Sequence, residues 1–382
     1  MESKLPDVGT TIFTVMSQLA NECDAINLSQ GFPSFDPDPW LLDRVTHYLN
    51  SGANQYAPMS GAPSLRAAIA GKVAAVYERQ VSVEHEITVT PGATEALFCA
   101  IMATVRTGDE VIVLDPAYDS YDPATTLAGG RTIHVPLQVD GDGEFSPDWE
   151  ALEDAINERT RLIILNFPHN PSGAILSADN LDTLATLVRD RDIYLLADEV
   201  YEHIVFDGND HQSLLRHDEL WERSFVVSSF GKTVHATGWK IGYCVAPAEL
   251  STEFRKVHQF NCFAVVTPMQ LALADFMTDK PEHYQKLPDF YENLRDHFAG
   301  LLGGSKWRLR PARSTFFQIA DYSDISDEKD TDIAMRLTRE IGVATIPVSV
   351  FCEAPSDRRL LRFCFAKDEA TLATAAERLR SL

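Results

Sequence analysis

The chain has 382 residues, of which 45% are hydrophobic and 23% charged, enough for one large domain with a substantial core and a smaller one. Acidic residues outnumber basic ones by 56 to 33, and the net charge of −23 argues against nucleic acid or an anionic membrane as partner, because both attract basic surfaces. Such acidity is typical of an ordinary solvated surface and also of a salt-rich cell interior, and both stay open. We expect small-molecule partners.

The cysteines and the first residues indicate a cytoplasmic protein. Six cysteines are scattered, mostly in apolar runs such as LFCA, GYCVA and RFCFA, and no CxxC pair occurs, which favours free thiols in a reducing compartment. The opening MESKLPDVGT has no apolar signal region, and no window approaches the roughly 18 apolar residues of a membrane span. No His, Cys, Asp or Glu residues have metal-ligand spacing, so no metal site is expected.

In chain order, the first 40 or so residues, with INLSQGFPSF and turns at Pro37 and Pro39, predict an arm that packs elsewhere. The middle of the chain alternates apolar strands with amphipathic helical patterns such as 177–190, where Ser177 is the expected N-cap. Near-continuous apolar runs are typical of parallel strands covered on both faces. The prediction is an α/β fold with a mostly parallel sheet and helices on both faces, its strands at 87–90, 110–115, 161–166, 193–198, 225–229 and 242–247.

The C-terminal part changes character and predicts a smaller α+β unit. STFFQIAD, VATIPVSVF and LLRFCFA are strand-like, and helical patterns lie around 330–341 and 368–381. We expect a large domain over residues 46–275 and a small domain formed by residues 1–45 and 276–382.

Ligands of open α/β sheets bind at the carboxyl ends of the strands, so the residues after each strand are candidates. PGATEAL follows the strand at 87–90, and the helix that starts after Gly92 has free N–H groups near Ala93 and Thr94 that suit a phosphate, although such turns are common in α/β proteins. PAYDSY follows the strand at 110–115 and places Tyr118 where its ring could stack on a flat cofactor.

The next two strand ends offer an amide and a carboxylate. FPHNPSG fixes the backbone of Asn170 between prolines and leaves its amide free, and DEVYEH supplies Asp198 and Tyr201. A strand-end Asp often only caps a turn, but the apolar residues YLLA precede Asp198. A carboxylate in that setting needs a cationic or hydrogen-bonding partner to stay ionised.

The segment SSFGKTVHATGWK holds Ser229 and two lysines, Lys232 and Lys240. Its GKT resembles the end of a P-loop, but the glycine required five positions earlier is replaced by Val226. A GxGxxG segment between strand and helix is also missing, which argues against a nucleotide-dependent dehydrogenase. A lysine, a carboxylate, hydrogen-bond donors, an aromatic ring and a phosphate cradle are together what pyridoxal phosphate needs, so the two lysines are expected to serve one cofactor.

The segments SSFGKTVHATGWKIG, NFPHNPSG, DEVYEH, PGATEAL and NQYAP resemble the signature segments of class I/II aminotransferases of fold type I. SKLPDVGTTIFTVMS, INLSQGFPSFD, GANQYAPMSG and LRFCFAK resemble its methionine aminotransferase and kynurenine aminotransferase (glutamine transaminase K) branch. The resemblance runs in order from about residue 4 to the C-terminus. It implies pyridoxal 5'-phosphate as cofactor and a homodimer with shared active sites.

The resemblance also implies roles for the residues around the cofactor ring. Lys232 matches the lysine that bonds to the cofactor and later moves a proton at the substrate Cα. Asp198 matches the partner of the pyridine nitrogen, and Asn170 and Tyr201 match the donors to the phenolic oxygen. Tyr118 matches the stacked ring.

Further positions match the phosphate site and the substrate site. Lys240 matches a basic phosphate ligand beside Ser229, Ala93 and Thr94. Arg362, which the residues alone would suggest as a surface or structural ion pair, matches the arginine that grips the substrate carboxylate. The remaining matches are Gly31 and Phe32 in a segment that closes on the substrate and Tyr56, lent to the neighbouring subunit's phosphate site. His169, His203 and His235 are expected to be structural.

The implied function is an aminotransferase that moves the amino group of methionine, aromatic or glutamine-like amino acids to a 2-oxo acid by a ping-pong mechanism. One alternative keeps the site but is a cysteine-S-conjugate β-lyase. Another is a non-catalytic ligand-sensing domain on this fold, although the chain is acidic and has no added helix-turn-helix segment. The preferred donor and acceptor stay open at this level.

Overall fold

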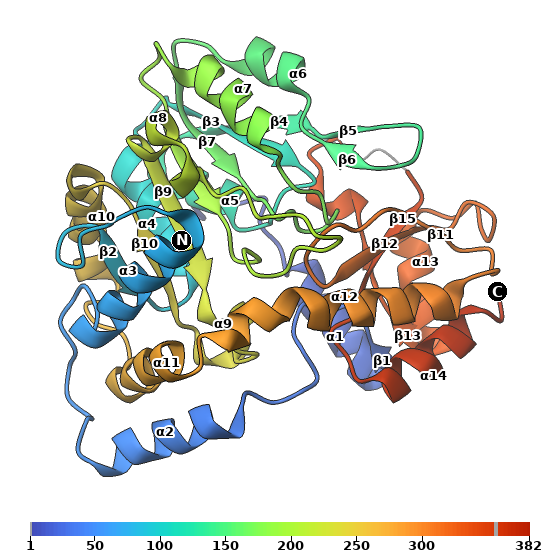
Figure 1. Ribbon diagram of the computed structural model, residues 1–382. Coiled ribbons are helices and arrows are strands. Elements are labelled where there is room, and N and C mark those ends of the chain that lie inside the picture. Colours follow the sequence, from blue (N-terminus) through green and yellow to red (C-terminus); the bar gives the residue numbers. More distant parts are fainter. Residues whose placement is uncertain (1, 355–357) are drawn as a thin grey trace.

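A seven-stranded sheet forms the centre of the computed structural model, which describes residues 2–354 and 358–382 (Figure 1). Its strand order is β2-β10-β9-β8-β7-β3-β4. Only β10 runs antiparallel to its neighbours, and the other pairs are parallel, which confirms the predicted mostly parallel α/β fold. The strands are β2 (Ile87–Thr90), β3 (Glu110–Asp115), β4 (Arg131–Pro136), β7 (Thr160–Leu165), β8 (Tyr194–Asp198), β9 (Ser224–Ser229) and β10 (Gly242–Val245).

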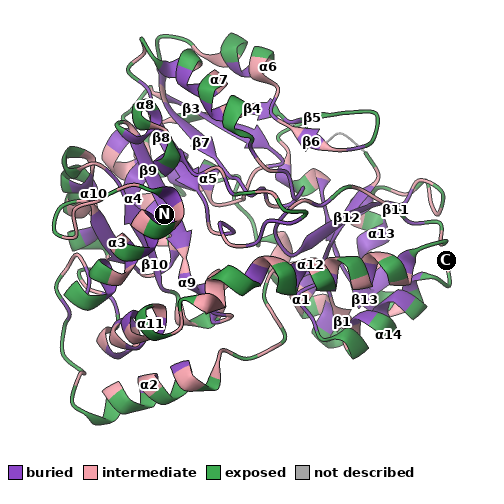
Figure 2. Ribbon diagram, in the orientation of Figure 1, coloured by how far each residue is buried: buried purple, intermediate pink, exposed green. Residues whose placement is uncertain are grey.

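Burial on both faces explains why most of these strands are largely apolar, whereas the edge strand β4 is only partly buried (Figure 2). On β3, Val111 and Val113 pack into the core under one helix layer, whereas Ile112 and Leu114 pack into the core under the other. The first layer contains α4 (Ala93–Thr104), α5 (Tyr121–Ala128) and α10 (Ala248–Asn261). The second contains α2 (Pro39–Asn50), α3 (Pro63–Tyr77), α6 (Trp149–Ala155), α7 (Ala178–Val188), α8 (Asp218–Trp221) and α11 (Thr267–Asp279).

Local signals set several of these boundaries. Ser177 caps α7 as predicted, in a capping box with Asn180. Short elements complete this part of the chain: β5 (Gln138–Val139) and β6 (Phe145–Ser146) pair with each other, α9 (Phe230–Thr233) follows β9, and 3-10 turns cover Leu214–Arg216 and Thr237–Trp239.

A second, four-stranded antiparallel sheet with the order β11-β12-β15-β14 forms the C-terminal unit. Its strands are β11 (Arg308–Leu309), β12 (Phe317–Asp321), β14 (Ile346–Pro347) and β15 (Leu360–Cys364), and its helices are α12 (Glu282–Leu302), α13 (Asp330–Arg336), continued by a π-helical turn over Leu337–Ile341, and α14 (Glu369–Leu379). The prediction of one strand over VATIPVSVF was wrong. The segment splits into β13 (Val343–Ala344), β14 and a 3-10 turn at Ser349–Phe351, where the Asp330 carboxylate accepts hydrogen bonds from the Ser349 amide and hydroxyl.

The N-terminal segment joins this C-terminal unit. β1 (Ile26–Asn27) pairs in parallel with β13, and α1 (Ile12–Glu22) lies beside the same elements, so the blue α1 and β1 lie among red C-terminal elements in Figure 1. The predicted boundary between residues 45 and 46 falls inside α2, and Arg44 on that helix binds Asp275 on α11 at 2.8 Å. The division into two domains stays a prediction.

Two further expectations concern thiols and membrane segments. All six cysteines are free; Cys99, Cys244 and Cys364 are buried, and the other three are half-buried. Within residues 2–354 and 358–382, no helix is both long enough and apolar enough to cross a membrane.

Candidate active site

A cavity of about 300 Å³ lies between the carboxyl edge of the large sheet, the N-terminal segment and the C-terminal unit. It gathers residues that are far apart in the sequence. The predicted site residues among its lining are Gly31, Ala93, Thr94, Tyr118, Asn170, Asp198, Tyr201, Ser229, Lys232, Lys240 and Arg362. Two predicted residues, Phe32 and Tyr56, are not part of the lining.

The direction of β10 explains why both lysines reach one cavity. Lys232 follows the end of β9, whereas Lys240 precedes the start of β10. Because β10 is antiparallel to β9, its amino end lies at the same edge of the sheet as the carboxyl ends of its neighbours. The chain therefore leaves and re-enters the sheet beside the cavity.

Lys232 projects from the short helix α9 toward the N-terminal segment. Its Nζ donates to the Gly31 carbonyl oxygen at 2.7 Å and lies 5.5 Å from the centre of the Tyr201 ring. Burial lowers the pKa of Lys232 to about 8, so this amine loses its proton more readily than an exposed lysine. An amine with these properties suits both covalent bonding and proton transfer.

Asp198 ends β8 with one carboxylate oxygen satisfied and one open. Its Oδ2 accepts from the Tyr121 hydroxyl at 2.8 Å, while Oδ1 is buried and has no hydrogen-bond partner in the described part of the chain. Burial raises the pKa of Asp198 to about 6, although the hydrogen bond from Tyr121 opposes that shift. A cationic N–H donor facing Oδ1 would remove this penalty.

Asn166 connects Asp198 with the loop after β7. Its Nδ2 donates to the Asp198 carbonyl at 3.0 Å, and its Oδ1 accepts from the Asn170 amide N–H at 3.1 Å. The Asn170 side chain in turn accepts from Arg362 at 2.8 Å. The loop residues thus hold their positions through one another.

Arg362, on β15, is only 1% exposed. Besides Asn170, its guanidinium donates to the Ser29 carbonyl at 2.8 Å and lies 4.0 Å from the centre of the Phe317 ring, while its Nε has no partner among the described residues. Burial lowers its pKa to about 10, which leaves it charged at neutral pH. The expectation from the residues alone, a surface or structural ion pair, was wrong. No carboxylate pairs with this arginine among the ion pairs of the described chain.

Close backbone packing shapes the end of the cavity at α4. Gly92 has φ +79°, and a methyl group there would lie 3.2 Å from Nζ of Lys240. A methyl group at Gly242 would lie 2.8 Å from the amide nitrogen of Ala93, so glycine lets β10 approach the start of α4. No side chain caps α4, which leaves its first N–H groups available beside the Lys240 ammonium.

Comparison with known proteins decides the family. The model of the aminotransferase class I and II family matches residues 24–379. The chain belongs to the class I and II aminotransferases. The protein is therefore an enzyme with the fold of type I pyridoxal phosphate enzymes, and its cofactor is pyridoxal 5'-phosphate. The non-catalytic alternative is set aside.

Relatives of this aminotransferase include the methionine aminotransferase of Escherichia coli, which is 52% identical over all of this chain and 98% of its own. Human kynurenine–oxoglutarate transaminase 1 is 32% identical over 95% of this chain and 93% of its own. The crystal structure of the E. coli protein YbdL, identified as a methionine aminotransferase, superposes with a TM-score of 0.97 at 52% identity, covering 100% of this chain and 99% of that one.

The donor set of the aminotransferase fits its cofactor. The open Oδ1 of Asp198 suits a protonated ring nitrogen, and Lys232 supplies an amine within the same cavity. The uncapped start of α4 with Lys240 suits a phosphate. The individual roles of these residues stay predictions.

Other residues of the aminotransferase lie outside the predicted set or outside the cavity. Sequence reasoning missed Tyr121, which differs in no local signal from the predicted Tyr118 three residues earlier. It also missed several lining residues, namely Phe13, Gln30, Leu97, Asn166, Val200, Gly231, Thr237, Ile241 and Phe317. Phe32 is half-exposed, with Nζ of Lys367 4.7 Å from its ring centre.

The three histidines expected to be structural do not line the cavity. Burial lowers the pKa of His169 to about 3 and that of His203 and His235 to about 4, so all three are neutral at physiological pH. His169 is held by the Ser172 hydroxyl at 2.7 Å, which fits the expected role in shaping its loop.

Proposed function

We propose that this aminotransferase moves the amino group of methionine, aromatic or glutamine-like amino acids to a 2-oxo acid by a ping-pong mechanism. The observation that carries the proposal is the composition of the cavity: Arg362 is the one guanidinium among its described lining residues, and Phe13 and Phe317 supply apolar surface near it. One arginine suits one carboxylate, and the apolar rings suit an apolar side chain. The names of the E. coli and human relatives support the same donor classes.

In this proposal the residues divide the chemistry between them. When bound, pyridoxal phosphate supplies an aldehyde that bonds to amines and a ring that accepts electron density from the substrate Cα. Lys232 would hold the cofactor through its amine, and the same amine would move the proton at the substrate Cα. Asp198 would hold the ring nitrogen in its protonated form, and Asn170 and Tyr201 would donate to the phenolic oxygen.

The remaining residues bind and orient. Tyr118 would stack on the ring, and Ser229, Lys240 and the first N–H groups of α4 at Ala93 and Thr94 would hold the phosphate. Arg362 binds the substrate carboxylate through two parallel hydrogen bonds. Gly31 and Phe32 belong to the segment that closes over the substrate.

A donor panel tests the substrate class. Methionine, phenylalanine and glutamine should each exceed aspartate by at least about tenfold in kcat/KM, because the second carboxylate of aspartate would be buried without a cation. The measurement is a kinetic series with several 2-oxo acids that scores the oxo-acid product and ammonia separately. Aspartate as the best donor would sink the proposal, and ammonia as the main product from cysteine S-conjugates would favour the β-lyase.

We also propose a homodimer whose subunits share their active sites, located in the cytoplasm because all six cysteines are free thiols. The support is a set of exposed apolar side chains, Tyr56, Phe260, Phe263 and Val266, of which Tyr56 and Phe260 are 83% and 86% exposed. The Tyr56 ring lies edge-on to the Phe263 ring, with the two ring centres 5.4 Å apart. Exposed aromatic clusters of this kind mark protein interfaces.

Subunit mixing tests the shared site. A Lys232→Ala chain mixed with a Tyr56→Phe chain should form heterodimers in which one site has both residues intact. At equal amounts about one quarter of all sites are then intact, and activity should rise above the mean of the two parents. With subunit exchange verified, activity no higher than that mean would refute the shared site.

A further inference from the structure

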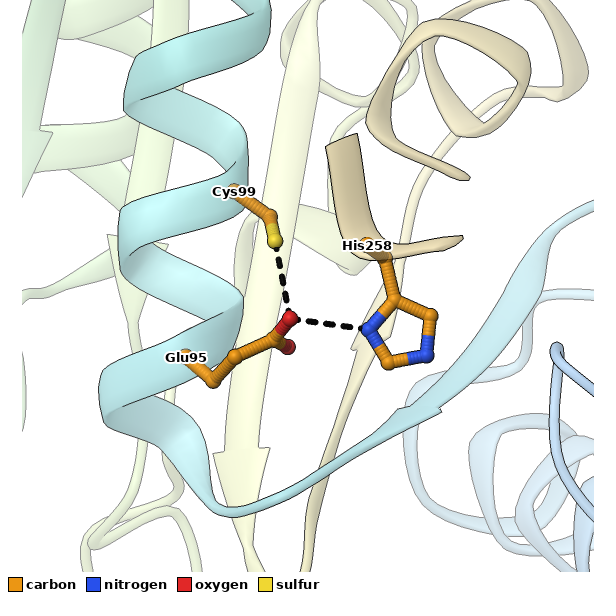
Figure 3. Close-up of side chains that lie close together, drawn as sticks. All are labelled: Glu95, Cys99 and His258. Carbon is orange, nitrogen blue, oxygen red and sulfur yellow. Dashed lines mark hydrogen bonds and ion pairs between the residues drawn. The ribbon is translucent and has the colours of Figure 1, made fainter. Parts of the chain in front are cut away.

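Behind the first turn of α4, three side chains from two helices form a buried cluster that does not line the cavity (Figure 3). Glu95 and Cys99 come from α4, and His258 comes from α10. One carboxylate oxygen of Glu95 accepts from Cys99 Sγ at 3.0 Å, from His258 Nδ1 at 2.9 Å and from the Asn261 amide at 3.1 Å. His258 is fully buried.

The hydrogen bonds of His258 define its charge. Its Nε2 lies 3.1 Å from the Met59 carbonyl oxygen, which only accepts, so Nε2 carries a proton. Nδ1 faces the Glu95 carboxylate oxygen, which also accepts hydrogen bonds from Cys99 and Asn261. An oxygen that accepts from three donors is typical of an ionised carboxylate. Both ring nitrogens therefore donate, and the pair is an imidazolium with a carboxylate. The three side chains are also close enough to hold a metal ion, but Nδ1 of His258 is already hydrogen-bonded to Glu95.

The position of Glu95 makes this pair relevant to the cofactor. It is the one acidic residue in the first turn of α4, directly after Thr94. Unpaired, its negative charge would oppose a phosphate bound at the same helix end, and the apolar surroundings would screen that repulsion only weakly. Burial raises the pKa of Glu95, but the hydrogen bond and charge of His258, together with the hydrogen bonds from Cys99 and Asn261, hold this pKa below its usual value.

We propose that His258 is a positioning residue for the cofactor phosphate: it cancels the charge of Glu95 and so keeps the first turn of α4 electropositive toward a phosphate monoester. The inference rests on the proposed phosphate site at Ala93, Thr94 and Lys240. It concerns a contact between helices rather than any group that touches the cofactor.

The test compares pyridoxal phosphate with pyridoxal, which has the same ring and aldehyde but no phosphate. Dissociation constants of both are measured by absorbance for the wild type, His258→Gln, His258→Gln/Glu95→Gln and the control Cys99→Ala. His258→Gln should weaken pyridoxal phosphate about tenfold and pyridoxal less than about twofold, because the bare carboxylate acts on the phosphate. The dissociation constant of the double variant for pyridoxal phosphate should return to within about threefold of the wild-type value. The control Cys99→Ala should bind both ligands as the wild type does.

The outcomes separate charge from packing. If His258 only fills space, the single variant weakens both ligands alike and the double variant is at least as weak, which overturns the proposal. Thermal unfolding of each variant identifies a folding defect, and a stable double variant that still loses affinity for pyridoxal phosphate also overturns it. Lys240→Ala checks the underlying site: an unchanged ratio of the two dissociation constants there would refute the proposed phosphate position itself.

Discussion

Replacing Lys232 by alanine should lower kcat by about 10⁴-fold or more, the upper end of what a positioned proton-transfer group contributes, because the same side chain is also proposed to hold the cofactor covalently. The structure supports the expectation by burying this amine in the cavity and lowering its pKa to about 8. Removing a buried amine should not unfold the protein, since its burial disfavours the charged form. The measurement is single-turnover and steady-state kinetics with methionine, with thermal unfolding as a check.

The second lysine provides the matched control. Lys240→Ala should weaken cofactor binding but keep the covalent bond, because its Nζ lies beside Gly92 at the start of α4 rather than near Gly31. Borohydride reduction of the loaded wild-type enzyme followed by peptide mapping should find the label on Lys232. A label on Lys240, or an active Lys232→Ala enzyme, would contradict the assignment.

Arg362→Lys should lower kcat/KM for every donor by a similar factor. Losing one partner of a buried charge-assisted pair typically costs about 2 to 5 kcal/mol, which is roughly 30-fold to several thousandfold in kcat/KM. Lysine cannot form two parallel bonds with a carboxylate, and it cannot replace the contacts to Asn170 and Ser29 together. The side-chain pocket is untouched, so the rank order of donors should stay nearly the same.

Kinetics with methionine, phenylalanine, glutamine and aspartate check this expectation. Arg308→Lys is the control, because Arg308 is exposed on β11 and pairs with the exposed Asp324. That variant should behave as the wild type, since such surface pairs contribute little. If Arg362→Lys reorders the donors instead of lowering all of them, the carboxylate assignment fails.

Much of the large sheet was predictable because most of its strands are apolar runs that can be recognised in the local sequence. β3 has the predicted bounds, and β7, β8, β9 and β10 differ by no more than two residues at either end. Reading the residue after each strand then found Asn170, Asp198 and Lys232, which the structure gathers around one cavity.

What sequence could not provide is contact between distant segments. The residues around Arg362 in the sequence do not predict that it is buried against Asn170, 192 residues away. The local sequence also carries no signal for the antiparallel direction of β10 or for the division of VATIPVSVF between two sheets, because the pairing partners of these strands lie elsewhere in the chain. The place of Tyr56 depends on a second copy of the chain and stays a prediction.

The bond between Arg362 and the Ser29 carbonyl joins residues 333 positions apart. During synthesis, all strands of the large sheet, together with Asp198, Lys232 and Lys240, are therefore made well before Arg362, the hydrogen-bond partner of Ser29. Domains commonly fold during synthesis in N-to-C order, and contacts this distant close late because they require the largest loss of chain entropy. A nascent chain halted between β10 and β15 would then already carry the groups assigned to the cofactor ring and phosphate while lacking the substrate clamp. Maturation of this enzyme would thus have an intrinsic order, with cofactor capture available earlier than amino-acid recognition.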